Sequence, residues 1–138
     1  MIMKHISTWI KGIAIGIVAG LIVYGITRYN KYIITYPADG AIVNMHEKVQ
    51  GKTPYIELNH YIVVTPIANG TDYIQDGPAN VTSNGRFVGT AAFGTMGVQG
   101  PQQFIVRVIA TKATLLSPSD KIPQDSKISS SITVNRIR

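Results

Sequence analysis

The chain contains no cysteine, only three histidines and few charged residues, which make up 14% of its 138 residues. The absence of cysteine excludes disulfides, thiolate zinc sites, iron–sulfur clusters and cysteine nucleophiles. The length excludes a large multidomain enzyme, because it allows one compact domain of about 100 residues together with an appendage. Charged residues are also scarcer than soluble domains usually carry, and this scarcity needs a cause.

The net charge of +6 is distributed unevenly along the chain. The first 35 residues contain Lys4, Lys11, Arg28 and Lys31 and no acidic residue, whereas residues 36–138 contain nine Lys/Arg and seven Asp/Glu. Most of the excess therefore flanks one apolar segment. A nucleic-acid-binding domain would concentrate cations and aromatic rings on its folded part, so we do not expect a nucleic-acid partner.

Residues 12–27 form an uncharged, predominantly apolar run. As a helix it would be about 24 Å long, which Trp9 and neighbouring apolar residues extend if Lys11 reaches toward the headgroups. Tyrosines such as Tyr32 supply interfacial rings downstream. The sequence predicts a tilted transmembrane helix over residues 7–29, with membrane lipid as its surroundings.

Two alternatives explain the same apolar run. A cleavable signal peptide should end in a small-x-small site, which residues 18–20 and 23–25 match poorly. A buried helix that is apolar on every face would need a larger protein around it. We therefore favour a single-pass membrane anchor over both alternatives.

The orientation of the anchor follows from a slight excess of positive charge on its amino side. It favours a cytoplasmic N-terminus in the cell membrane and an extracytoplasmic C-terminal domain. Asn69-Gly70-Thr71 and Asn80-Val81-Thr82 are possible glycosylation acceptors in that domain.

Small residues recur along one face of the predicted helix. Gly12, Gly16 and Gly20 are spaced four apart, so they would stack on one another and let another helix approach closely. Glycine is also common in membrane helices generally. We expect this ridge to pack against other transmembrane subunits.

After Tyr36-Pro37 the pattern changes to short β-branched and aromatic runs separated by turn residues. This pattern predicts a mainly β domain over residues 34–138, following an anchor and juxtamembrane segment over residues 1–33. About seven strands, in an antiparallel β-sandwich, are expected. Their predicted ranges are 41–44, 47–50, 61–66, 72–75, 86–93, 104–111 and 131–137.

Alternation within two predicted strands indicates which side chains are buried. Phe104, Val106, Val108 and Ala110 share one face of their strand and should lie in the core. Residues 61–64 are almost continuously apolar, which is typical of a strand between packed layers or of one whose outer face meets a partner.

Turn and strand landmarks recur along the domain, at residues 34–41, 49–51, 61–66, 73–75, 84–87, 93–94, 103–106 and 132–136. They resemble those of Ig-like β-sandwich modules on prokaryotic cell-surface and membrane-anchored proteins. The resemblance covers nearly all of residues 34–138. It implies an Ig-like fold of about seven strands and no catalytic activity.

Few residues offer catalytic or metal-binding chemistry. His46 and Glu47 are adjacent and would point to opposite faces of a strand, and nothing brings His60 to them, so no metal site is predicted. Asp72 and Asp76 would lie about 13 Å apart on an extended chain, which favours turn residues over an acid–base pair.

Other segments also lack a catalytic pattern. Residues 129–131 are serines without a nucleophile motif, and residues 94–100 lack the lysine and helix of a phosphate loop. We therefore expect no enzyme activity, no cofactor and no small-molecule substrate.

Five aromatic residues of the β domain could form a binding platform or fill its core. Most strand aromatics in a small domain are needed for the core, so we assign about two-thirds of them to it. The three tyrosines remain possible partner contacts. The five residues are Tyr55, Tyr61, Tyr73, Phe87 and Phe93.

These features together indicate a non-enzymatic accessory subunit of a larger integral-membrane complex. Its helix would pack in the membrane, and its β domain would brace extracytoplasmic partners. Residues 28–36 lack the Gly, Ser and Pro content of a flexible tether, so a short, stiff connection is expected. The alternative is a membrane-anchored adhesion or carbohydrate-binding module.

Overall fold

A computed structural model describes residues 31–94, 100–115 and 118–137. The described part contains strands and no helix, and its compact unit begins at Tyr32. The strands are β1 (Ile33–Tyr36), β2 (His46–Lys52), β3 (Asn59–Pro66), β4 (Tyr73–Ile74), β5 (Asn80–Val81), β6 (Arg86–Ala92), β7 (Gln102–Thr111), β8 (Lys127–Ile128) and β9 (Ile132–Arg136).

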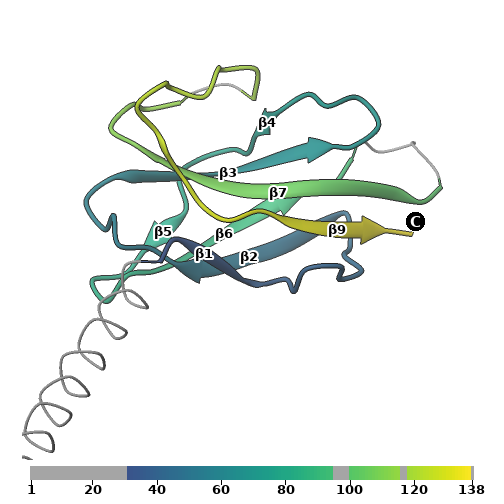
Figure 1. Ribbon diagram of the computed structural model, residues 1–138, viewed down its shortest axis with the longest axis horizontal. Helices are drawn as coiled ribbons and strands as arrows, with labels where there is room; N and C mark the ends of the chain where they lie inside the picture. Colours follow the sequence, from purple (N-terminus) through teal and green to yellow (C-terminus); the bar gives the residue numbers. More distant parts are fainter. Residues whose placement is uncertain (1–30, 95–99, 116–117, 138) are drawn as a thin grey trace, which may run out of the picture. The chain divides into compact units, whose positions relative to one another are not determined.

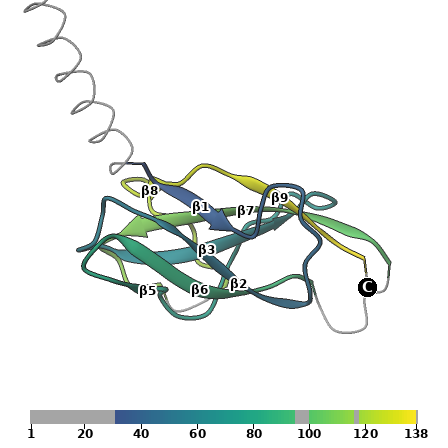
Figure 2. The ribbon, with the colours of Figure 1, turned by 90° about the horizontal axis from the view of Figure 1, so that it is seen from below.

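The strands form two antiparallel sheets that lie one above the other (Figure 1). The first sheet has the order β1-β2-β6-β5, and the second has the order β4-β3-β7-β8 with β9 also paired to β7. Figure 2 shows the two layers from a second direction. The prediction of a mainly β domain is confirmed.

The main core lies between the two sheets, as the alternation in β7 predicts. Phe104, Val106, Val108 and Ala110 are fully buried there. Val49, Phe87 and other residues of the first sheet meet them from the opposite side. Removing such side chains from water is the main source of stability for a domain of this kind.

A second, smaller cluster covers the outer face of the β3–β7 sheet. Tyr61, Val63 and Ile109 point away from the main core and are nevertheless buried. The segment between β7 and β8 covers them, since Leu115 and Ile122 pack on the cluster. The backbone N–H of Leu115 donates to the Tyr61 hydroxyl at 3.1 Å. The continuous apolar run in β3 is therefore buried on both faces by the chain itself.

The outer face of the first sheet is more exposed. In β2, buried Val49 and Gly51 alternate with exposed Lys48 and Gln50. A Cβ atom at Gly51 would collide with the Ile33 carbonyl oxygen and the Phe87 ring, so only glycine lets β1 and the ring approach here.

Six of the predicted strands have counterparts with shifted ends, from β2 to β9. The predicted strand over residues 41–44 is reduced to a single bridge between Ile42 and Asn135. The prediction missed β1, β5 and β8, because the last two are only two residues long and β1 follows directly on the segment assigned to the anchor.

The first residue of the compact unit lies in the core. Tyr32 is 9% exposed, and its hydroxyl lies 2.7 Å from His60 Nδ1. Its ring packs on Tyr55 and Phe87. The prediction that Tyr32 is an interfacial ring at the membrane is therefore wrong.

The predicted transmembrane helix over residues 7–29 and its ridge of Gly12, Gly16 and Gly20 lie outside the described residues. Within the part of the chain that the structure does describe, no helix has the length and apolar character needed to cross a membrane.

Candidate functional site

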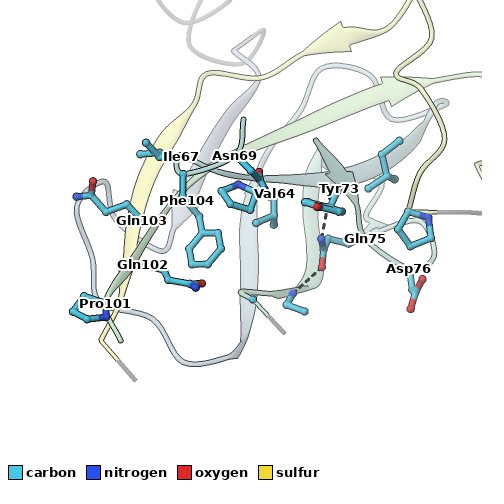
Figure 3. A pocket seen from close by; sticks show the side chains of 16 residues that line it. Val64, Ile67, Asn69, Tyr73, Gln75, Asp76, Pro101, Gln102, Gln103 and Phe104 are labelled. Carbon is cyan, nitrogen blue, oxygen red and sulfur yellow. Dashed lines mark hydrogen bonds between the residues drawn. The ribbon is translucent and has the colours of Figure 1, made fainter. Parts of the chain in front are cut away.

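A pocket of about 710 Å³ lies where β3 ends and β7 begins, beside β4 (Figure 3). This volume falls within the range of small-molecule and peptide-side-chain sites. The described residues that line it are Val64, Pro66, Ile67, Ala68, Asn69, Tyr73, Ile74, Gln75, Asp76, Ala92, Gly94, Pro101, Gln102, Gln103, Phe104 and Pro118.

The pocket has an apolar floor and a mixed rim. Val64 and Phe104 are buried in the core between the sheets, and Ile74 is buried in the smaller outer cluster. Ile67 is 48% exposed and Tyr73 is 40% exposed, so these two large side chains stand at the rim. The pocket therefore offers apolar contact area that water reaches in the free protein.

Gln75 connects the two sheets along one side of the pocket. Its Oε1 accepts a hydrogen bond from the Ala92 N–H at 2.7 Å, and its Nε2 donates to the Tyr73 carbonyl at 3.2 Å (Figure 3). Both ends of the amide are held, so Gln75 fixes β4 beside the last residue of β6.

A buried arginine supports the pocket near Gly94. Arg136 is 1% exposed, and its Nη1 donates to the Phe93 carbonyl at 2.5 Å. Gly94 has a φ of 99°, and a Cβ atom there would collide with the Arg136 guanidinium. Arg136 and a glycine at position 94 therefore determine where the chain turns at the end of β6.

The polar groups of the rim are mainly amides. Gln103 Nε2 donates to Asn135 Oδ1 at 2.9 Å, and Asn69 Oδ1 accepts from the Thr71 N–H at 2.9 Å. Among the described lining residues, Asp76 is the one carboxylate. Amides, one carboxylate and a phenol can bind polar groups of a ligand, and they offer no nucleophile with an adjacent base.

The three tyrosines predicted as partner contacts do not form one surface. Tyr73 lies at the pocket rim, whereas half-buried Tyr55 packs beside Tyr32 with ring centroids 5.6 Å apart. Tyr61 is 1% exposed beneath Leu115. The assignment of Tyr61 as a partner contact is corrected, because the chain's own segment covers its ring.

Both predicted glycosylation acceptors are exposed. Asn69 lines the pocket, and Asn80 lies in β5 at the edge of the first sheet. A glycan at Asn69 would stand beside Tyr73 and restrict access to the pocket.

His60 is held inside the protein. It is fully buried, and its Nε2 lies 2.6 Å from the Tyr55 carbonyl. Since a carbonyl oxygen only accepts, Nε2 carries the proton and Nδ1 accepts from the Tyr32 hydroxyl. Burial lowers the pKa of His60 and raises the pKa of Tyr32, so both side chains remain neutral near pH 7.

Two of the other ionisable side chains considered in the sequence have local partners. Glu47 accepts from the Tyr36 hydroxyl at 3.1 Å, and Asp72 forms an ion pair with Arg107 at 2.8 Å. No group of three His, Cys, Asp or Glu residues within the described ranges is arranged to hold a metal ion.

Sequence analysis missed the pocket and the residues that shape it. Gln75 and Arg136 lie in segments that the sequence analysis singled out for other reasons, and each bonds to a residue distant in the chain. The clearest sequence signal for the pocket was the segment of residues 73–75. Its tyrosine, Tyr73, was selected as a possible partner contact and not as part of a pocket.

The chain matches no protein-family profile, no curated protein and no solved structure.

Proposed function

We propose that this protein is a non-enzymatic, single-pass accessory subunit of an integral-membrane complex, whose β domain braces extracytoplasmic partners. The observation that carries this proposal is the position of Tyr32. It lies directly after Lys31 and is already a core residue.

Tyr32 is held in the β domain by two backbone and side-chain contacts. Its hydroxyl bonds to His60 in β3, and its carbonyl oxygen accepts from the Ser130 N–H at 3.1 Å. Ile33 then begins β1 immediately. A domain that is ordered from its first residue suits a bracing subunit, whereas an adhesin gains reach from a long, loose stalk.

An Ig-like fold is part of the proposal, and the strand order supports it. In Ig constant-type domains one sheet has the order A-B-E-D and the other contains C, F and G. Here β1-β2-β6-β5 corresponds to A-B-E-D, and β3, β7 and β9 correspond to C, F and G. The short β4 extends the second sheet beside β3.

The pocket is our candidate for the surface that contacts the partner. Tyr73 and Ile67 stand beside amide groups, and aromatic anchors with a polar rim are typical of protein interfaces. β3 begins at Asn59, one residue before the His60 that contacts Tyr32, and ends at Pro66 at the pocket. The pocket therefore lies toward the end of the domain opposite to Tyr32.

The test is an insertion of eight Gly/Ser residues after Lys31. The complex is extracted in detergent and its native mass is measured, with the partner identified by its own mass. We expect the insertion to reduce partner recovery severalfold, because it decouples the domain from the anchor. The control carries the same eight residues after Arg138. Full recovery with the internal insertion would overturn the bracing proposal.

A carbohydrate-binding module is the second candidate, because amides, a carboxylate and an exposed tyrosine surround one pocket. Tyr73→Ala should then abolish binding to a neutral oligosaccharide on a glycan array. Tyr36→Ala is the matched control, since Tyr36 is 47% exposed and does not line the pocket. If the wild-type chain captures no glycan, this second candidate is eliminated.

A further inference from the structure

Basic residues gather at the end of the domain where the chain enters it. In the first sheet Ile33 pairs with Lys52, and Lys52 pairs with Arg86, so these positions lie side by side. In the second sheet Ala110 pairs with Lys127, and Lys112 follows the last residue of β7. Lys31 directly precedes Tyr32.

The ends of the two sheets meet at the same place. Tyr32 bonds to His60 near the start of β3, and its carbonyl accepts from Ser130, which follows β8. Figure 2 shows β8 close to the beginning of β1. We call this surface the entry end and define it by five cations, which are Lys31, Lys52, Arg86, Lys112 and Lys127.

The entry end carries a positive charge that neighbouring acids only partly offset. Among the described residues, none of the five cations forms an ion pair. The loops that adjoin these strand ends contain two acids, Glu57 between β2 and β3 and Asp125 before β8, so the local net charge is +3. The opposite end instead carries acids, such as Asp39 in the turn after β1 and Glu47 at the start of β2.

An exposed apolar side chain stands among these cations. Ile56 is 47% exposed, and its Cγ2 lies beside Gly85, in the turn that precedes Arg86. Cations around an exposed apolar residue are the pattern of surfaces that bind the headgroup region of a bilayer.

We propose that the entry end binds acidic lipid headgroups of the membrane that anchors the chain. This inference rests on the proposed function, because it takes residues 7–29 as the anchor. Tyr32 follows the apolar run of residues 12–27 by five residues, which span at most about 18 Å of extended chain. That distance allows the cations to come within a Debye length of the headgroups, about 8 Å at physiological ionic strength.

The location of the cations favours a lipid surface over a nucleic acid. A nucleic-acid site would need cations with aromatic rings between them. Here the nearby rings of Tyr32 and Phe87 are buried in the core, and the ring of Tyr55 is half-buried against Tyr32. The cations instead surround the point to which the apolar segment is covalently joined.

The test places one fluorescent label on the full chain in vesicles. Because the chain has no cysteine, Ser83→Cys labels only the exposed turn before β6 at the entry end, and Ala38→Cys labels an exposed turn at the opposite end. Quenching by neutral acrylamide is compared in phosphatidylcholine vesicles and in vesicles with 30% phosphatidylglycerol. We expect quenching of the Ser83→Cys label to be at least about twofold weaker in the acidic vesicles, and 0.5 M salt to remove this difference.

Charge reversal provides the matched comparison. Lys112→Glu with Lys127→Glu changes the local charge from +3 to −1 and should abolish the protection of the Ser83→Cys label. Lys48→Glu with Lys121→Glu makes the same change in net charge at exposed positions outside the entry end, and protection should remain. Equal quenching in both vesicle types, or equal effects of the two double variants, would overturn the inference.

Flotation of the same samples separates this inference from the proposed function. If the wild-type chain fails to float with neutral vesicles, the anchor is wrong and the proposed function falls. Salt-sensitive flotation with acidic vesicles alone would then still support the binding of acidic headgroups by the entry end. If added duplex DNA protects the Ser83→Cys label from quenching in detergent without acidic lipid, the entry end binds a nucleic acid, and the inference is overturned.

Discussion

The two sheets of the domain use the same strand geometry in different surroundings. The first sheet buries one face, and the outer side of β2 exposes Lys48 and Gln50. The second sheet buries both faces of β3 and much of β7, because the segment after β7 folds back over Tyr61 and Ile109. The first sheet is therefore buried on one face only, whereas the centre of the second sheet is buried on both faces.

This difference shows what an apolar run means in a small domain. Alternation of apolar and polar residues indicates a strand with one solvent-exposed face, whereas a continuous apolar run indicates a strand between two layers. The second layer does not have to be a sheet or a partner. Here Leu115 and Ile122, two described residues that belong to no strand, pack on its outer face.

The largest expected loss of stability comes from a substitution in the outer cluster of the second sheet. Ile109→Ala should destabilise the domain by about 2–5 kcal/mol, because it leaves a cavity beneath Leu115 and Ile122. Chemical denaturation of residues 31–138 measures the change. Thr90→Ala, at an exposed position of β6, is the control and should change stability by about 0.5 kcal/mol at most. Similar costs for the two variants would contradict the difference between the sheets.

Next in size is the effect of a smaller side chain in the main core. Val106→Ala or Val108→Ala should each cost roughly 1–3 kcal/mol, since both side chains are fully buried between the sheets. Thermal melts of the same fragment should show lower midpoints. Unchanged midpoints would refute the assignment of this face of β7 to the core.

The smallest predicted effect concerns pH and the contact that joins the two sheets through Tyr32 and His60. Because burial lowers the pKa of His60, the unfolded chain binds a proton at higher pH than the folded domain does. Stability is therefore fully present above the unfolded pKa of about 6.5, and it is lost as pH falls toward the folded pKa. The slope should reach at most about 1.4 kcal/mol per pH unit.

Denaturation of residues 31–138 between pH 7.5 and 5 measures this slope. His60→Gln should flatten the profile, because the variant has no titrating imidazole in the core. His46→Gln is the matched control, since His46 is exposed, and it should retain the wild-type slope. A wild-type profile that is flat over this range would contradict the assignment.

Local patterns predicted much of the fold. The period of two in residues 104–110 identified the core side of β7 because neighbouring positions experience different surroundings. The burial of Tyr61 could not be read in the same way. An apolar side chain on the outer face looks the same in sequence whether a partner or a distant segment of the same chain covers it.

The pocket depended on contacts that no local pattern contains. Gln75 bonds to Ala92, 17 residues away, and Arg136 bonds to Phe93, 43 residues away. Glutamine and arginine are usually surface residues, so their structural roles depend on which carbonyl or amide the fold brings to them. Tyr73 was selected as one of five aromatics of the β domain, because aromatic rings give a large contact area, and its exposure became known only from the structure.

The position of Tyr32 also has a mechanical consequence. A tension applied at Lys31 would reach β1 through Ile33 and, through the contact of Tyr32 with His60, would reach β3 in the other sheet at the same time. The load is thereby divided between two layers before any single pair of strands has to bear it alone. Peeling β1 from β2 requires the Tyr32 ring to leave the core first, so the domain resists pulling at the residue through which its predicted anchor would pull.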